Sequence, residues 1–424
     1  MARFGRSAGR LRGVRAVATV AATAALAISG AAQQVHTHVP VEVDATLDWP
    51  TLIATTLAAH PGSGELAART AEAEAWERRG RQWLAAAPSL YFSYLSDRPL
   101  DDVGQREYEG GVELPLWHGG QRDAVQAVAA SATAGSAAAA AALRLEVTGL
   151  LRGSLWDIEA AANDLAAARE AQAVALELVR VVEMRNARGD LPRADLLLAR
   201  ATLLERRQGV VAAEAGLLDA ERAYRSLTNL DRRPALLAEP RSALDELAPS
   251  HPLLALADAT IARARADLGL VDRETRGNVT VTVGPRREYA PFGTVPNDSM
   301  ALAVKVPVGG KSHGVTHSTR ATRLVAAAET ERGQLLRRLD LDLHEAEHTL
   351  AVLEETAALA AERIELTEQQ ARMAQSAFAQ GEIELRELLR IQESALGARR
   401  DVQRLDIERL RTIAALNQAL GETP

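Results

Sequence analysis

Apolar residues recur at regular seven-residue spacing in the second half of the 424-residue chain. One series runs from Leu336 to Phe378, and a second begins three residues later at Leu339. Two apolar positions per seven residues are typical of helices packed as coiled coils. The segment between the last apolar–polar alternation and Gly381 is therefore predicted to be one helix of about 65 residues, about 100 Å long.

Four short segments instead alternate apolar and polar residues with a period of two, which is typical of β-strands. They are residues 88–96, 107–115, 277–285 and 299–307. Each is about nine residues long, which is the length of a transmembrane β-strand. A half-buried sheet of a soluble protein would show the same alternation.

The aromatic residues favour the membrane interpretation. Seven of them lie in or beside the predicted strands: Tyr91, Phe92, Tyr94, Tyr108, Trp117, Tyr289 and Phe292. Girdles of aromatic residues flank strands that cross a bilayer. Two hairpins cannot close a barrel, however, and open sheet edges are not tolerated in lipid. Either the sheet is soluble, or several chains pool their strands.

The chain is predicted to be a tandem duplication. Pro115 and Pro307 are separated by the same 192 residues as Gly189 and Gly381. We assign residues 33–240 to the first repeat and 241–424 to the second. Each contains a helix, two strands, a very long helix, a turn and a helix, with the turns at about 187–193 and 379–385.

Composition narrows the classes of function. The chain is 47% apolar but only 3% aromatic, so its packing depends on Ala, Leu and Val, and Ala and Leu also favour helix. It contains no cysteine, which excludes disulfides, thiolate metal sites, cysteine nucleophiles and a lipidated N-terminal cysteine.

Residues 1–32 are predicted to be a secretory signal peptide. Five arginines precede an apolar segment at 16–28, and small residues at 30–32 offer a cleavage site. The apolar segment is shorter than the about 20 residues that a membrane span needs. Loss of the five arginines changes the formal charge from −7 to −12, which argues against a nucleic-acid partner.

Several motifs, in their order and duplication, resemble the TolC-type outer membrane efflux proteins. Each second strand ends in a proline before a Gly-rich turn, in VELPLWHGGQR (112–122) and VKVPVGGK (304–311). Gly189 and Gly381 are each followed six positions later by an acidic residue, and the chain ends in ALNQALG (415–421). Family members often have Ser or Thr before that acidic residue, where this chain has Ala194 and Arg386.

The resemblance implies a mainly helical fold with a small β part. Three chains would assemble into an α/β-barrel, with four transmembrane strands per chain continued by a long coiled-coil helical barrel. It further implies a non-enzymatic exit duct in the outer membrane that requires no cofactor. Its partners would be outer-membrane lipid, a periplasmic adaptor protein and an inner-membrane pump of the RND type. The compact length and the segments GEIELRELLR (381–390) and ALNQALG (415–421) resemble the branch associated with heavy-metal efflux of the cobalt–zinc–cadmium type.

Two sets of residues are candidates for function in such a duct. Glu107, Glu109 and Glu113 share one strand face and would line the pore together with Lys305; rings of carboxylates favour cations. The acidic turns would meet the adaptor, through Gly189, Asp190, Asp195, Gly381, Glu382, Glu384 and Glu387. We hypothesise that ion pairs of these carboxylates with Arg193 and Arg386 close the turns at rest.

Four other motifs have simpler explanations. His344 and His348 form an H-E-x-x-H match, but they lie off the coiled-coil seam, so solvent-exposed positions are favoured over a zinc site. Gly310-Lys311-Ser312 resembles a P-loop ending, yet Lys305 stands where the first glycine is required. His36 with His38 is a weak metal-binding candidate, and a disordered leader segment is favoured there. His313 and His317 are a second weak candidate, because their i, i+4 spacing follows directly after a strand.

Two other functional classes remain open at this point. The main alternative to a duct is a secreted or periplasmic coiled-coil scaffold with a soluble β-subdomain. A third hypothesis is an exported zinc metalloprotease that uses His344 and His348.

Overall fold

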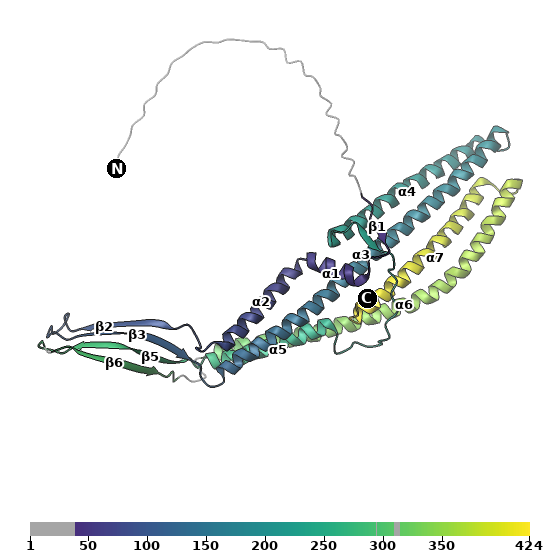
Figure 1. The fold of residues 1–424 in the computed structure, drawn as a ribbon. Helices are drawn as coiled ribbons and strands as arrows, with labels where there is room; N and C mark the ends of the chain where they lie inside the picture. The colour runs from purple at the N-terminus through teal and green to yellow at the C-terminus, as the bar shows by residue number, and fades with distance from the viewer. Residues whose placement is uncertain (1–38, 294, 309–313) are drawn as a thin grey trace, which may run out of the picture. The chain divides into compact units, whose positions relative to one another are not determined.

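Helices make up most of the chain, and four of its strands form one sheet (Figure 1). The computed structural model describes residues 39–293, 295–308 and 314–424. The predicted signal peptide, His36, His38, the 310–312 motif and His313 lie outside the described residues. Residues 40–424 belong to one compact unit.

The order of elements repeats along the chain. They are β1 (Glu42–Asp44), α1 (Trp49–Ala59), α2 (Gly62–Arg81), β2 (Ser89–Ser96), β3 (Arg106–Leu116), α3 (Gln121–Ala187), α4 (Arg193–Thr228), β4 (Arg232–Pro234), α5 (Pro252–Glu274), β5 (Val279–Tyr289), β6 (Asn297–Lys305), α6 (Val315–Gln380) and α7 (Leu385–Ala419). A helix, a hairpin, a very long helix, a turn and a helix occur first as α2–α4 and again as α5–α7. The predicted mainly helical fold with four short strands is confirmed.

The sheet is antiparallel, in the order β2-β3-β5-β6, so β2 and β6 are its two edges. Strand β5 extends to Tyr289, four residues beyond the predicted end. The sequence obscured this extension because Arg286, Arg287 and Glu288 interrupt the apolar alternation. In the structure these residues stay paired with β3 and β6. A separate pair, β1 with β4, is parallel and three residues long.

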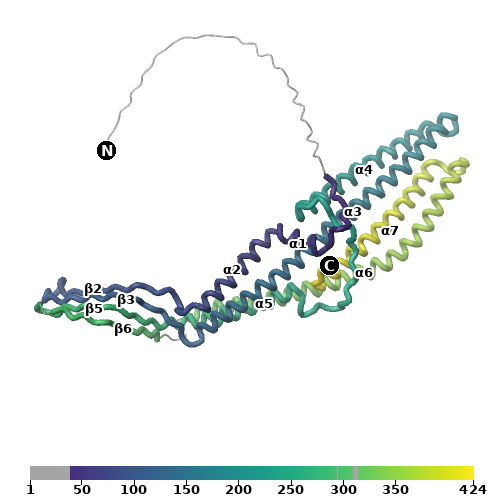
Figure 2. The backbone as a smooth tube through the Cα atoms, viewed as in Figure 1, coloured from purple at the N-terminus to yellow at the C-terminus, as the bar shows by residue number. Residues whose placement is uncertain are grey.

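Four long helices lie side by side in the order α4, α3, α7, α6, which we call the helical layer (Figure 2). The predicted coiled-coil seam of α6 is confirmed, since Leu339, Leu343, Leu350, Ala374 and Phe378 are all buried. Near the turns, one apolar cluster joins all four helices and includes Val182, Leu203, Phe378 and Leu388.

One helix, α3, contains an 18-residue window that is apolar and long enough to cross a membrane, and 28% of that window is buried. Composition and length alone are weak evidence for a span. α3 also packs along α2 and α5, and the hydroxyls of Thr70 on α2 and Ser136 on α3 hydrogen-bond at 2.8 Å.

The two His-Pro pairs have the same role in both repeats. The Nδ1 of His60 accepts the N–H of Gly62 (3.1 Å), and the Nδ1 of His251 accepts the N–H of Leu253 (3.2 Å) at the start of α5. Such side-chain acceptors satisfy free N–H groups at helix starts. Burial lowers the pKa of His251, which favours the neutral imidazole that can accept this bond.

A buried polar network, which we call the clamp, joins α3 to the segment between β4 and α5 and to the end of α7. The guanidinium of Arg152 donates to both carboxylate oxygens of Glu239, at 2.8 and 2.5 Å, and to Gln418 Oε1 at 2.6 Å. Asn417 donates to Glu239 Oε2 (3.2 Å), and its own Oδ1 accepts the N–H of Ser242 (2.9 Å). The clamp explains why two polar residues, Asn417 and Gln418, lie within the otherwise apolar segment ALNQALG.

Substitution of Arg152 is expected to destabilise the protein strongly. Arg152→Met leaves the carboxylate of Glu239 buried without its cation, and breaking a buried pair in this way costs about 3–5 kcal/mol. Arg169→Met removes an exposed pair with Glu214 and should cost about 1 kcal/mol or less. Denaturant unfolding of the purified variants measures both, and equal losses would show that the clamp adds nothing.

Candidate functional site

The four-stranded sheet has one polar face, because residues directly opposite each other on neighbouring strands share a face. Glu109 lies opposite Ser93 on β2 and Arg286 on β5. The register collects these residues on the polar face: Ser89, Ser93, Glu107, Glu109, Glu113, Thr280, Thr282, Arg286, Glu288, Asn297, Ser299 and Lys305. All four proposed pore-lining residues are therefore on one side of the sheet.

The opposite face is apolar and uncovered in the single chain. It presents Leu90, Phe92, Tyr94, Tyr108, Val112, Leu114, Val281, Val283, Met300, Leu302 and Val304. Leu90 is 88% exposed, and Met300 and Leu302 are each 71% exposed. A continuous apolar surface of this kind marks a contact with a membrane or with another protein.

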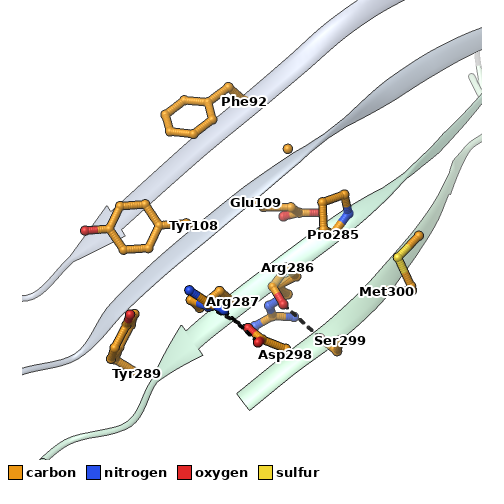
Figure 3. A pocket seen from close by; sticks show the side chains of 11 residues that line it. Phe92, Tyr108, Glu109, Pro285, Arg286, Arg287, Tyr289, Asp298, Ser299 and Met300 are labelled. Carbon is orange, nitrogen blue, oxygen red and sulfur yellow. Dashed lines mark hydrogen bonds and ion pairs between the residues drawn. The ribbon is translucent and has the colours of Figure 1, made fainter. Parts of the chain in front are cut away.

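Aromatic rings gather on the apolar face near the hairpin loops. The rings of Tyr94 and Tyr108 are 4.9 Å apart, and those of Tyr108 and Tyr289 are 6.3 Å apart. Beside them, Arg287 binds Asp298 through two bonds of 2.6 and 2.7 Å. Figure 3 shows this ion pair at a hollow lined also by Phe92 and Met300. Amphipathic side chains thus border the apolar band at its loop end.

Arg286 changes the expected charge of the polar face. Its Nε lies 2.7 Å from Glu107 Oε1, and its Nη2 lies 3.6 Å from Glu288. Glu113 accepts a hydrogen bond from Ser89 (3.0 Å). The predicted carboxylates are therefore partly neutralised by a cation that the sequence analysis missed, because the strand was expected to end at 285. Glu109 forms no ion pair with a described residue of its own chain.

Two glycines allow β3 and β5 to approach closely in the middle of the sheet. A Cβ on Gly284 would lie 1.8 Å from the carbonyl oxygen of Gly110, and a Cβ on Gly111 would lie 2.6 Å from that of Val283. Glycine in a strand interior often marks a bend or a close backbone approach. Pro285, next to Gly284, removes a backbone donor at the same point.

The first predicted turn is a glycine-terminated helix end. Gly189 has a φ of +87°, which is a left-handed conformation that glycine adopts without strain. The N–H of Gly189 donates to Asn186 O (3.0 Å), and the N–H of Asp190 donates to Arg185 O (2.9 Å). This pair of bonds is the Schellman motif.

The second turn repeats this geometry. Gly381 has a φ of +82°, its N–H donates to Phe378 O (3.0 Å), and the N–H of Glu382 donates to Ala377 O (2.9 Å). Four bonds at matching positions in two repeats indicate one duplicated turn. Both glycines and both following carboxylates are exposed.

Arg185 connects the two turns. Its Nη1 donates to Phe378 O at 2.6 Å, and its guanidinium lies 5.0 Å from the centre of the Phe378 ring. A cation is favoured at a helix C-terminus. Farther along the layer, Arg399 bridges Glu170 on α3 and Glu368 on α6. These contacts hold the α3–α4 hairpin against the α6–α7 hairpin.

The acidic side chains at the turns have other partners than expected. Glu387 pairs with Arg390 on its own helix at 2.5 Å, and this cation lowers the pKa of the Glu387 carboxyl. Among the described residues of one chain, neither Arg193 nor Arg386 forms an ion pair. Asp195 is half-buried, and Glu384 is exposed.

His344 and His348 lie on the exposed side of α6. Their rings are parallel, with centres 6.4 Å apart, as i, i+4 spacing on a helix requires. No cluster of three or more potential metal ligands occurs among the described residues. His317 lies near the start of α6 and is away from both.

Comparison with known proteins identifies the fold. No family model and no curated protein sequence matches the chain. Its structure is similar to the outer membrane protein VceC of Vibrio cholerae, with a TM-score of 0.71 and 16% identity, over 88% of this chain and 96% of that one. The CmeC outer membrane channel of Campylobacter jejuni gives 0.69 and 14%, over 88% and 85%.

A third similar structure is CusC, which is described as forming a transmembrane channel. The TM-score is 0.68 and the identity 15%, over 91% of this chain and 94% of that one. The chain therefore has the fold of the TolC-type outer membrane channels. The predicted resemblance is confirmed for the fold, and these structures do not single out the heavy-metal branch.

Alanine at position 284 is expected to disrupt the sheet, whereas alanine at 110 is expected to be tolerated. The first Cβ would meet a backbone oxygen at 1.8 Å, and the second has no neighbour closer than 3.8 Å. We expect Gly284→Ala to lower the free energy of unfolding by about 2 kcal/mol or more, and Gly110→Ala to change it by about 0.5 kcal/mol. Denaturant titration followed by circular dichroism measures both, and equal effects would contradict the close approach.

Proposed function

We propose that this protein is the outer-membrane duct of a tripartite efflux system. The observation that carries the proposal is the sheet, which presents an uncovered apolar face, a charged opposite face and two unpaired edges. In a membrane the apolar face meets lipid, and the charged face lines water. A soluble scaffold would need another protein to cover the apolar face.

The two edges of the sheet require partners, because backbone N–H and C=O groups cannot stay unpaired in lipid. β2 runs away from the helices and β6 runs back toward them, so β6 of one chain can pair with β2 of the next in the antiparallel sense. Three chains would give a closed barrel of twelve strands. The number three comes from the family resemblance.

The charges on the polar face indicate which ions would pass. Glu107, Glu109, Glu113 and Glu288 outnumber Arg286 and Lys305 on this face. Acidic linings favour cations. A barrel with this lining would conduct cations in preference to anions, and the chain would act as a passive path without a catalytic step.

The helical layer would continue the duct through the periplasm. Its exposed turns, with Gly189, Asp190, Gly381, Glu382 and Glu384, would meet a periplasmic adaptor protein, with Asp195 and Glu387 just inside. An inner-membrane pump of the RND type would supply the energy. For cargo we propose heavy-metal cations, supported by the acidic lining and by the 381–390 segment.

Fractionation separates the duct from the scaffold. Because the apolar sheet face needs lipid, we expect the protein to reside in outer-membrane fractions as a trimer that dissociates only on heating. In planar bilayers the purified trimer is expected to form cation-selective pores. A freely soluble periplasmic monomer would reject the duct and support the scaffold.

Resistance of bacteria to toxic compounds tests the proposed cargo independently of the proposed duct. A strain that lacks its own copy should regain resistance to cobalt, zinc and cadmium salts when the chain is restored. Regained resistance to organic drugs, with no change toward the metals, would contradict the metal cargo and leave the duct intact.

The turns are expected to restrict conductance at rest. Arg185→Ala removes the bond to Phe378 O that holds the two hairpins together, so we expect a several-fold higher single-channel conductance. Arg180→Ala is the control, because Arg180 pairs with Glu177 on its own helix. If carboxylates at the turns also contribute, the double variant Glu384→Gln, Glu387→Gln raises conductance as well. Unchanged conductance in Arg185→Ala would refute closure by this contact.

A further inference from the structure

The charged residues of the apolar sheet face are gathered at one end of it. They are Arg106, Arg287 and Asp298, which lie in the two rows of side chains nearest the hairpin loops. Toward the helices, the register gives this face only apolar residues, with one glycine and one proline. A charge on the lipid side of a barrel is costly at the middle of the bilayer and nearly neutral at its surface. The charges therefore mark the loop end of the sheet as an end that meets lipid headgroups.

Both arginines form a compact group with two tyrosines. Arg106 is directly opposite Tyr289, and Tyr108 is directly opposite Arg287. Opposite residues share a face, and diagonal neighbours on adjacent strands are only about 7–8 Å apart. The four side chains therefore surround one place on the apolar face, and we call them the Arg–Tyr quartet. Figure 3 shows three of them, Tyr108, Arg287 and Tyr289, close together.

The quartet carries positive charge and hydrogen-bond donors. Arg287 binds Asp298 through Nε and Nη2, which fixes the plane of the guanidinium and leaves Nη1 outside this ion pair. Arg106 is exposed and forms no ion pair with a described residue of its own chain. Because two cations stand beside one carboxylate, the group keeps an uncompensated positive charge. It is therefore suited to an anion.

Apolar surface continues directly from the quartet. The hollow beside it is lined by Tyr108, Arg287 and Tyr289, and also by Phe92 and Met300. The side chains of Phe92 and Met300 are 73% and 71% exposed. A ligand that fits the whole surface has an anionic group next to hydrocarbon. An inorganic anion would leave the apolar part uncovered.

We propose that the Arg–Tyr quartet binds a phosphate group of a lipid in the outer leaflet of the outer membrane. Guanidinium groups bind phosphate oxygens through parallel N–H···O bonds, and the tyrosine hydroxyls are further donors. The acyl chains of the lipid then lie on the apolar face toward the helices. This inference deepens the proposed duct and rests on it, because insertion with periplasmic helices places the hairpin loops at that leaflet.

Native mass spectrometry of the full-length protein, purified as the assembled duct in a detergent without phosphate, tests the site. The probes are lipid A, a phosphorylated glycolipid, and the same lipid with its phosphates removed. Because charge-assisted bonds to phosphate are lost, we expect the double variant Arg106→Gln, Arg287→Gln to retain lipid A about tenfold less well than the native protein. The native protein should discriminate between the two lipids by a similar factor.

Two further variants make the result specific. Arg286→Gln removes the same charge one residue away on the opposite face of the sheet, so it is expected to retain lipid A as the native protein does. Arg106→Gln alone breaks no ion pair with a described residue of its own chain. It is expected to weaken the retention of lipid A several-fold, and it replaces the double variant if that protein fails to fold.

Three results would overturn the phosphate site and leave the duct intact. They are equal retention of the two lipids by the native protein, an equal loss in Arg286→Gln and the double variant, and displacement of lipid A by inorganic phosphate. The last result would show that the site takes a free anion. A native protein that stays a soluble monomer would refute the duct, and the lipid site with it.

Discussion

Packing in a layer only one helix thick governs this molecule. An inner helix of the layer has a neighbour on each side, so it must bury two opposite stripes, where a helix at the surface of a globular core buries one. α3 meets α4 on one side and α7 on the other, and its buried residues are correspondingly spread along its whole length. The buried rings of Trp156 and Tyr224 lie in one cluster where α1 packs on α3 and α4, and elsewhere the layer buries few rings. Small and medium apolar side chains, repeated along the helices, are sufficient.

This constraint explains which parts of the fold the sequence could predict. Coiled-coil seams have a fixed period, so the long α6 helix was predicted from two series of seven-residue spacing that include Leu343 and Leu350. The duplication was visible because Gly189 and Gly381 must adopt left-handed conformations, which restricts the residue at both turns. The alternation of Val281 and Val283 likewise predicted a strand with two unlike faces.

Other features depend on contacts between distant segments and have no local pattern. Arg286 was missed because the three consecutive charged residues from Arg286 to Glu288 indicate the end of a strand. Its partner Glu107 lies 179 residues away in the sequence, so no local pattern points to the pair. Arg185 was missed because its partner is a backbone carbonyl on another helix, and a contact of this kind leaves no pattern in the sequence. On α4, Leu197, Leu204 and Val211 have the seven-residue spacing of a buried seam, but their exposure is known only once the neighbours of α4 are known.

The clamp has a kinetic consequence. Arg152 meets Gln418, which is 266 residues later in the chain. Contacts between such distant positions form late, after the entropy of closing the intervening loop has been overcome. The cation of Arg152 is matched by Glu239, only 87 residues later in the chain, so the clamp closes in two steps and Gln418 joins last.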